Sequence, residues 1–197
     1  MYLTKEDFLK ILRGGYRTMT DYNSKIKRVL CTEEEIAAAI QEAGKKISEK
    51  YAGKPLLLVG FLKGSFIFMA DLMRAITIPC EMSFMAAKVY FPDEKNTNGS
   101  ITVKLDVQQD VENYHVVLVE DIIDTGRTIK EVVDVLNDRG PLSLEVVTLV
   151  DKPACRMVDF QPDMALFTME DVYVIGCGMD CGEHYRNLPY LAEYDRG

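Results

Sequence analysis

Two adjacent carboxylates follow an apolar run in the stretch VVLVEDIIDTGRT, residues 116–128. Glu120 and Asp121 offer oxygen acceptors that can bind the two hydroxyls of a vicinal diol, or hold Mg²⁺ through its water ligands. The alternative is that the pair caps the next helix or lies in solvent. The acids therefore form a candidate sugar or metal site whose assignment depends on its neighbours.

The second half of this stretch, DTGRT at 124–128, is typical of an anion site. A strand-to-helix turn with a glycine and two threonines presents backbone N–H groups and hydroxyls at a helix N-terminus, which suits a phosphate group. The chain lacks a Walker sequence, because in the segment GFLKGS at 60–65 the lysine precedes the second glycine. The prediction is therefore a phosphate monoester rather than a nucleoside triphosphate tail.

Two lysines follow other apolar runs and are further candidates. Lys63 lies between glycines after one run, and Lys152 follows Asp151 after another. The alternatives are that Lys63 is an ordinary exposed side chain and that Lys152, with Pro153 next to it, marks a turn.

Strands that alternate with helices must position these groups. Thr32 and Glu35 form a capping box that predicts a helix over 32–50. Helical spacing of apolar residues predicts two more helices, at 65–76 and 129–136. Apolar or alternating runs predict six strands, at 56–59, 80–90, 101–105, 115–120, 144–150 and 172–175. The polar segment 91–100 predicts a mobile loop.

This order of elements predicts an α/β fold with a mainly parallel central sheet flanked by helices. Ligands of such sheets bind at the carboxyl ends of the strands. Segments 60–64, 120–121 and 151–152 each follow a predicted strand. We therefore expect these three segments to converge on one site.

Composition and charge exclude several classes of protein. The 197 residues suit one globular domain, and 48% hydrophobic with 27% charged residues is an ordinary profile for a folded protein. The net charge of −8 disfavours a nucleic-acid partner. A locally basic stretch is interpreted as a solvated or subunit-facing surface: Arg13, Arg17, Lys25, Lys27 and Arg28. Since no apolar stretch could span a bilayer and the start lacks an apolar signal core, no membrane partner is expected.

Five scattered cysteines favour reduced thiols and a cytoplasmic location over a disulfide framework. Cys177, Cys181 and His184 could be imagined as a metal site, but their spacing is not a usual zinc pattern and a fourth ligand is missing. An anionic substrate would need a cation or backbone dipoles to offset the negative charge of the chain.

The stretch at 116–128 resembles the phosphoribosyl-pyrophosphate signature of the type I phosphoribosyltransferases, and more narrowly that of the members acting on hypoxanthine and guanine. GFLKGS at 60–65 is similar to the pyrophosphate loop of that family, and LVDKP at 149–153 to its purine-lysine segment. VYVIGCGMDCGEHYRNL at 172–188 resembles its closing hood. The blocks occur in family order, and their combination is far more specific than any one of them.

The resemblance implies a role for each residue of the signature. Glu120 and Asp121 would hold the ribose hydroxyls, directly or through metal-bound water, and would be Mg²⁺ ligands. Asp124 would be catalytic, reaching the purine N7 as general acid and base. The other members would bind substrate, chiefly around the 5′-phosphate: Ile122, Ile123, Thr125, Gly126, Arg127 and Thr128.

The pyrophosphate loop and the hood carry further implied roles. Lys63 and Gly64 would contact pyrophosphate, in a loop where the family often has a non-proline cis peptide before the lysine. Arg186 would lie near the same group. Asp180 would bind a second Mg²⁺.

The purine would be recognised by three residues. Lys152, the second catalytic candidate, would donate to the 6-oxo group, and a site built around such a donor should reject adenine. Tyr173 would stack on the purine, although its place in an apolar run also suits a core residue. The backbone near Val174 would face the purine 2-position.

One position departs from the family pattern. The mobile loop of the family carries a Ser-Tyr pair, whereas this chain has Lys88, Val89 and Tyr90. Either the alignment shifts by one residue or the serine hydroxyl is absent. Tyr90 stays a substrate-binding candidate, since loop closure excludes water mainly by covering the site.

As a whole, the resemblance implies one domain over residues 1–197, with a small hood over the carboxyl ends of the strands formed by the N-terminal segment and about residues 152–197. It implies Mg²⁺-dependent transfer of 5-phosphoribosyl from phosphoribosyl pyrophosphate to hypoxanthine or guanine, giving IMP or GMP and pyrophosphate in purine salvage. Homodimers and homotetramers both occur in the family. Two alternatives stay open: a xanthine-preferring or broad 6-oxopurine enzyme, and a nucleotide-sensing regulator.

Overall fold

The computed structural model describes residues 22–91 and 99–197. Predictions for residues 1–21 of the hood, which include Arg13 and Arg17, and for most of the loop at 91–100 lie outside these ranges.

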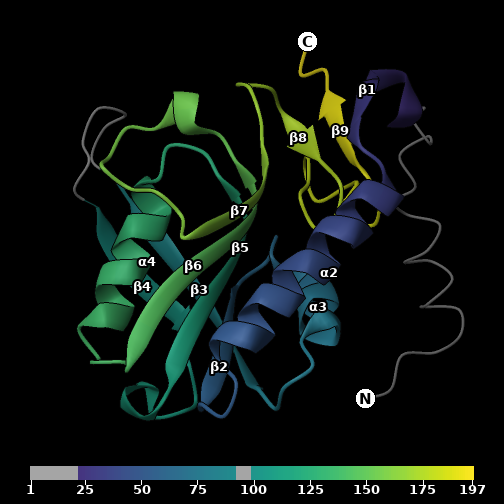
Figure 1. Cartoon of the computed structure of the whole chain (residues 1–197). Helices are drawn as coiled ribbons and strands as arrows, with labels where there is room; N and C mark the ends of the chain where they lie inside the picture. The colour runs from purple at the N-terminus through teal and green to yellow at the C-terminus, as the bar shows by residue number, and fades with distance from the viewer. Residues whose placement is uncertain (1–21, 92–98) are drawn as a thin grey trace, which may run out of the picture.

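A six-stranded sheet forms the centre of the molecule (Figure 1). Its spatial order is β4-β3-β2-β5-β6-β7. Neighbouring strands are parallel except for β4, which is antiparallel to β3. The mainly parallel α/β sheet predicted from the order of elements is confirmed. The strands are β2 (Leu56–Phe61), β3 (Glu81–Tyr90), β4 (Ser100–Leu105), β5 (His115–Ile123), β6 (Ser143–Asp151) and β7 (Met164–Thr168).

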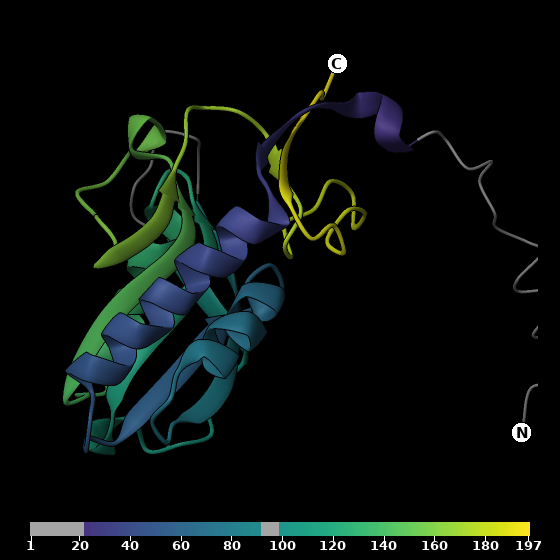
Figure 2. The ribbon, with the colours of Figure 1, turned by 45° about the vertical axis from the view of Figure 1, so that its right-hand side comes forward.

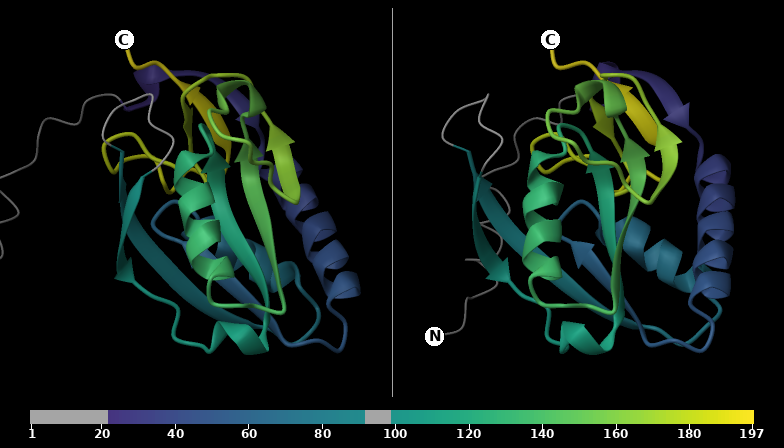
Figure 3. Two further views of the ribbon diagram at one scale, coloured as in Figure 1. Left: turned by 90° about the vertical axis from the view of Figure 1, so that its left-hand side faces the viewer. Right: turned by 60° about the vertical axis from the view of Figure 1, so that its left-hand side comes forward.

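Three α-helices of the described chain cover the sheet: α2 (Glu33–Lys50), α3 (Phe66–Ala75) and α4 (Arg127–Asn137). The predicted capping box starts α2, because the Glu35 N–H donates to Thr32 Oγ1 at 3.2 Å and the Thr32 N–H donates to Glu35 at 2.8 Å. The helices α2 and α3 lie side by side on one face of the sheet (Figure 2), and α4 lies on the other (Figure 3). Within the described ranges, no helix combines the length and apolar character needed to cross a bilayer.

The continuous apolar run of β2 follows from burial on both faces. Leu56 and Leu58 belong to the core under α2 and α3, whereas Leu57 and Val59 belong to the core under α4. A parallel strand between two helical layers has no polar face. Short 3₁₀ turns connect the elements, at Tyr22–Lys25, Val111–Asn113 and Pro153–Cys155.

A smaller antiparallel sheet has the order β1-β9-β8 and comprises β1 (Ile26–Cys31), β8 (Val174–Ile175) and β9 (Leu191–Tyr194). We call this sheet, with the loop 176–190, the hood. The strand predicted at 172–175 is shorter than expected and lies in this sheet. The strands β1, β7 and β9 were not predicted, because all three are short and β1 and β7 carry mostly exposed or half-buried side chains.

The strand β5 corrects one expectation. The prediction ended this strand at residue 120, but its pairing with β6 continues through Ile122 and Val150 to Ile123 and Asp151. The acidic pair therefore lies within the strand. The length of β6 explains the difference, because it supplies backbone partners beyond the acids.

Candidate active site

The carboxyl ends of β2, β5 and β6 lie side by side at one edge of the main sheet. A Cβ atom added to Gly64 would lie 1.7 Å from Oδ2 of Asp121, so the loop after β2 touches the acidic pair. The backbone N–H of Lys152 donates to the Ile123 carbonyl at 2.9 Å. The three segments singled out in the sequence therefore meet in one place.

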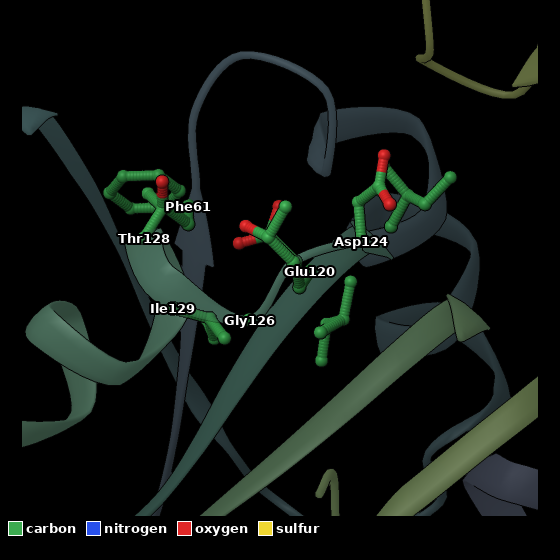
Figure 4. A pocket seen from close by; sticks show the side chains of 9 residues that line it. Phe61, Glu120, Asp124, Gly126, Thr128 and Ile129 are labelled. Atoms are coloured by element: carbon green, nitrogen blue, oxygen red, sulfur yellow. The ribbon is translucent and has the colours of Figure 1, made fainter. Parts of the chain in front are cut away.

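A cavity of about 240 Å³ opens at the end of β5. In the view of Figure 4, the Glu120 side chain lies between Asp124 on one side and Phe61 and Thr128 on the other. Its lining joins two acids, two hydroxyls and apolar side chains: Phe61, Glu120, Ile122, Ile123, Asp124, Thr125, Gly126, Thr128 and Ile129. The cavity thus contains most of the residues that the signature assigns to a phosphorylated sugar.

The turn before α4 brings Thr125, Gly126 and Thr128 to the lining of this cavity. Gly126 precedes the helix with φ 78°, in the left-handed region that favours glycine. Because a glycine stands at the N-cap, the first turn of α4 has no side-chain cap. Its N–H groups and the positive end of the helix dipole suit an anion. The Arg127 guanidinium stacks over the Phe91 ring at 4.3 Å.

Arg156 supports this turn and was not identified in the sequence. Its guanidinium donates to the carbonyl oxygens of Asp124 at 2.5 Å, Ile123 at 3.3 Å and Phe160 at 2.9 Å, and it pairs with the Asp151 carboxylate. Arg156 also packs against Gly126, where an added Cβ would lie 2.6 Å from its Cδ. Because the partners are mostly backbone carbonyls, no sequence pattern marks this residue.

We expect Arg156→Ala to lower the free energy of unfolding by about 3 kcal/mol, because it leaves Asp151 buried without its cation. The two side chains are only 11% and 12% exposed. Arg139→Ala is the matched control, since it breaks a more exposed pair with Asp106 and should cost less than ~1 kcal/mol. Urea unfolding of both variants measures the difference, and equal losses would contradict the bracing role of Arg156.

The acidic pair has the chemistry of a cation site. Glu120 is buried, and this burial raises its pKa well above the usual range, with Asp121 raising it further. The Asp121 N–H also approaches Glu120 Oε1 at 3.3 Å. A buried carboxylate next to a second one favours a bound divalent cation, and carboxylate oxygen is the ligand that Mg²⁺ prefers.

Lys152 is buried at the end of β6, with 4% of its surface exposed. Its ammonium lies 3.6 Å from Oδ2 of Asp124 and 3.9 Å from Oδ1 of Asp171. Ligand-type atoms of these two acids and of Cys155 lie within 4.8 Å of one another. Desolvation, and after it the two acids, raise the pKa of the Cys155 thiol to about 11. Since Lys152 already supplies a positive charge to this cluster, we interpret the cluster as an ion-pair group around the lysine.

The hood closes against the loop after β2. A Cβ on Gly178 would lie 1.9 Å from the Gly64 carbonyl oxygen, so the two backbones touch. The peptide bond between Leu62 and Lys63 is cis, as the resemblance implied. Arg186 donates to the Gly178 carbonyl at 2.7 Å and lies 2.8 Å from Oδ1 of Asp180. The residues predicted to contact pyrophosphate (Gly64 and Arg186) and the second Mg²⁺ (Asp180) therefore lie where the hood touches the loop after β2.

Gly178→Ala should lower the free energy of unfolding by about 2 kcal/mol or more, because the residue has φ 102° and its Cβ would clash with backbone. Gly53→Ala separates the effect of backbone strain from the effect of the clash, since Gly53 has φ 72° but no atom within 4 Å of its Cβ position. Chemical denaturation compares the two variants. A loss for Gly178→Ala no larger than for Gly53→Ala would show that the contact is not tight.

Three candidates, Tyr173, Val174 and Tyr90, do not line the cavity at the end of β5. The Tyr173 hydroxyl donates to the Asp180 carbonyl at 2.9 Å, and Arg196 lies over its ring at 4.7 Å. Val174 is buried in β8. Tyr90 is exposed at the carboxyl end of β3. Stacking by Tyr173 and closure by Tyr90 stay predictions.

Comparison with known proteins gives consistent matches. Residues 30–182 match the family model of the phosphoribosyl transferase domain. The chain is 43% identical over 166 residues to the hypoxanthine-guanine phosphoribosyltransferase of Streptococcus pneumoniae strain R6, over 84% of this chain and 92% of that protein. A crystal structure of a hypoxanthine phosphoribosyltransferase from Staphylococcus aureus aligns with a TM-score of 0.85 at 36% identity, covering 91% of this chain and 97% of the other. A mutant of the Trypanosoma cruzi hypoxanthine phosphoribosyltransferase, in its ternary substrates complex, aligns with a TM-score of 0.83 at 34% identity, covering 88% and 97%.

Proposed function

Because the chain belongs to the phosphoribosyl transferase family, we propose that it transfers the 5-phosphoribosyl group of phosphoribosyl pyrophosphate to N9 of hypoxanthine or guanine. The products are IMP or GMP and pyrophosphate, and the physiological role is purine salvage. The observation that carries the proposal is the buried Lys152 ammonium, 3.6 Å from Asp124, at the end of the strand beside the acidic pair. It provides a donor for the 6-oxo group of a purine next to a sugar-phosphate pocket.

The sugar phosphate is held at the end of β5. The N–H groups and hydroxyls of residues 124–128 surround the 5′-phosphate, supported by the uncapped first turn of α4. Glu120 and Asp121 accept hydrogen bonds from the two ribose hydroxyls. This arrangement orients the anomeric carbon toward the base, so that the two reactants meet in one geometry.

The base is oriented by hydrogen bonds at two of its positions. Lys152 donates to the 6-oxo group, and Asp124 exchanges a proton with N7 as the bond from N9 to the anomeric carbon forms. The C1′–O bond to pyrophosphate breaks, which gives that carbon oxocarbenium character. The residues present suit Mg²⁺: Glu120, Asp121 and Asp180 would hold it, and it would neutralise the leaving pyrophosphate.

The direct test is incubation of the chain with phosphoribosyl pyrophosphate, Mg²⁺ and each purine in turn, followed by chromatographic identification of the nucleotide. We expect IMP from hypoxanthine and GMP from guanine, and no AMP from adenine. A higher rate with xanthine would favour the broad or xanthine-preferring enzyme. Absence of every nucleotide would contradict the proposal.

We further infer that residues 1–197 fold as one domain with the N-terminal segment in its hood, and that this domain forms a homodimer or homotetramer. The hood range predicted at about 152–197 is too wide, because β7 within it pairs with β6 in the main sheet. A cytoplasmic location is supported by the five free cysteines, which suit a reducing compartment.

A further inference from the structure

The two cations proposed for pyrophosphate are bridged by a carboxylate of the chain itself. Lys63 Nζ lies 3.0 Å from Oε1 of Glu183, and Arg186 Nη2 lies 3.2 Å from its Oε2. The two oxygens of one acid thus contact cations from the loop after β2 and from the hood. These are the contacts that two oxygens of a phosphate group would make.

The backbone around Glu183 gives an independent reason to look at its side chain. Cys181 and His184 exchange two backbone hydrogen bonds of 3.2 Å, and the residues between them have positive φ, 60° for Gly182 and 69° for Glu183. This is a type I′ turn, which favours glycine or asparagine at both central positions. A glutamate in the left-handed region is uncommon, so turn formation alone does not account for it.

The other charges of this region are also neutralised internally. Arg186 Nη2 lies 2.8 Å from Oδ1 of Asp180, and the Glu183 N–H donates to Oδ2 of Asp180 at 2.7 Å. Hydrogen bonds from Lys63, and next from Arg186, lower the pKa of Glu183. Its side chain is 64% exposed, so it can swing away into solvent when a ligand arrives.

We propose that Glu183 is an internal counter-anion of the pyrophosphate subsite, which an incoming diphosphate must displace from Lys63 and Arg186. The inference rests on the proposed function, because that function assigns pyrophosphate to these two cations. A competing carboxylate weakens the binding of pyrophosphate and of phosphoribosyl pyrophosphate. It also favours release of the product, because the carboxylate returns to the cations as the diphosphate leaves.

The test is calorimetric titration of inorganic pyrophosphate, at constant Mg²⁺, into the full chain and its variants. We expect Glu183→Gln to lower the Kd of pyrophosphate by about 3- to 10-fold, the range for removal of two exposed ion pairs that compete with the ligand. Glu183→Gly should do the same, since glycine suits the turn and the variant retains the backbone N–H to Asp180. Glu42→Gln is the matched control: it removes one negative charge from an exposed pair with Lys46 on α2 and should leave the Kd unchanged.

The opposite outcomes overturn the inference. An unchanged Kd in both Glu183 variants would mean that the carboxylate does not compete with the ligand, and a higher Kd would mean that it positions Arg186 for the ligand. An equal decrease in Glu42→Gln would assign the effect to net charge. Nucleotide synthesis by the unmodified chain is measured separately: synthesis with an unchanged Kd contradicts only the role of Glu183, and tighter pyrophosphate binding without synthesis contradicts only the proposed reaction.

Discussion

Asp124→Ala is expected to lower kcat for IMP formation by about 10²–10⁴-fold, the usual contribution of a positioned general acid or base. The Asp124 carboxylate is half exposed, lines the cavity at the end of β5 and lies 3.6 Å from the Lys152 ammonium. It is therefore open to the substrate while its position is restrained by a buried cation. The KM for phosphoribosyl pyrophosphate should change much less, because the backbone donors of the turn do not depend on this side chain.

Steady-state kinetics with hypoxanthine separate the two parameters. Asp134→Ala is the control, since Asp134 pairs with Lys130 at 2.6 Å on the exposed surface of α4, away from the cavity. That variant should retain full turnover. An Asp124→Ala enzyme with unchanged kcat would rule out proton transfer by this residue, and a loss confined to KM would reduce its role to binding.

Lys152→Gln should lower kcat/KM for hypoxanthine by about 10³-fold and reduce the preference for hypoxanthine over adenine by ~10²-fold or more. The lysine is a pure donor held in a buried position, and the 6-amino group of adenine, which is also a donor, offers it no acceptor. A glutamine amide can either donate to an oxo group or accept from an amino group. The preference for hypoxanthine over adenine should therefore fall strongly, whereas the free energy of unfolding should change little.

The measurement is the ratio of kcat/KM values for the two bases, determined for the unmodified chain, for Lys152→Gln and for Lys130→Gln as an exposed control on α4. Loss of Lys152 leaves Asp124 and Asp171 without this cation, but both side chains are well exposed and can be hydrated. The variant should therefore fold. A preserved ratio of hypoxanthine to adenine would refute recognition of the 6-oxo group by Lys152.

Five of the six strands of the main sheet, all but β7, and the three described helices could be predicted because their signals are local. The run at 56–59 reads as a buried strand since both of its faces are covered, and the capping box at Thr32 and Glu35 marks the start of α2 from four residues alone. The convergence of the three loop segments followed from parallel topology, which places the carboxyl ends of neighbouring strands at one edge. The strands β1 and β9 carry no such signal, because their pairing joins segments about 165 residues apart.

The contacts that support the site were harder to predict. Arg156 donates hydrogen bonds to backbone carbonyl oxygens, which every residue possesses. The position of Arg156 in the sequence therefore does not reveal its partners. Glu183 stands in a turn whose positive φ is visible only in three dimensions. The family resemblance assigned charges to a ligand, but it gave no indication that these charges neutralise one another within the chain.

The position of β9 has a consequence for biosynthesis. This strand is the middle of the small sheet, so β1 and β8 have no direct hydrogen bonds to each other and both depend on residues 191–194. All strands of the main sheet precede these residues in the sequence. During translation the sheet that holds the sugar phosphate can therefore assemble first, whereas β1, synthesised long before, must wait for β9 to leave the ribosome before the cover of the crevice is complete.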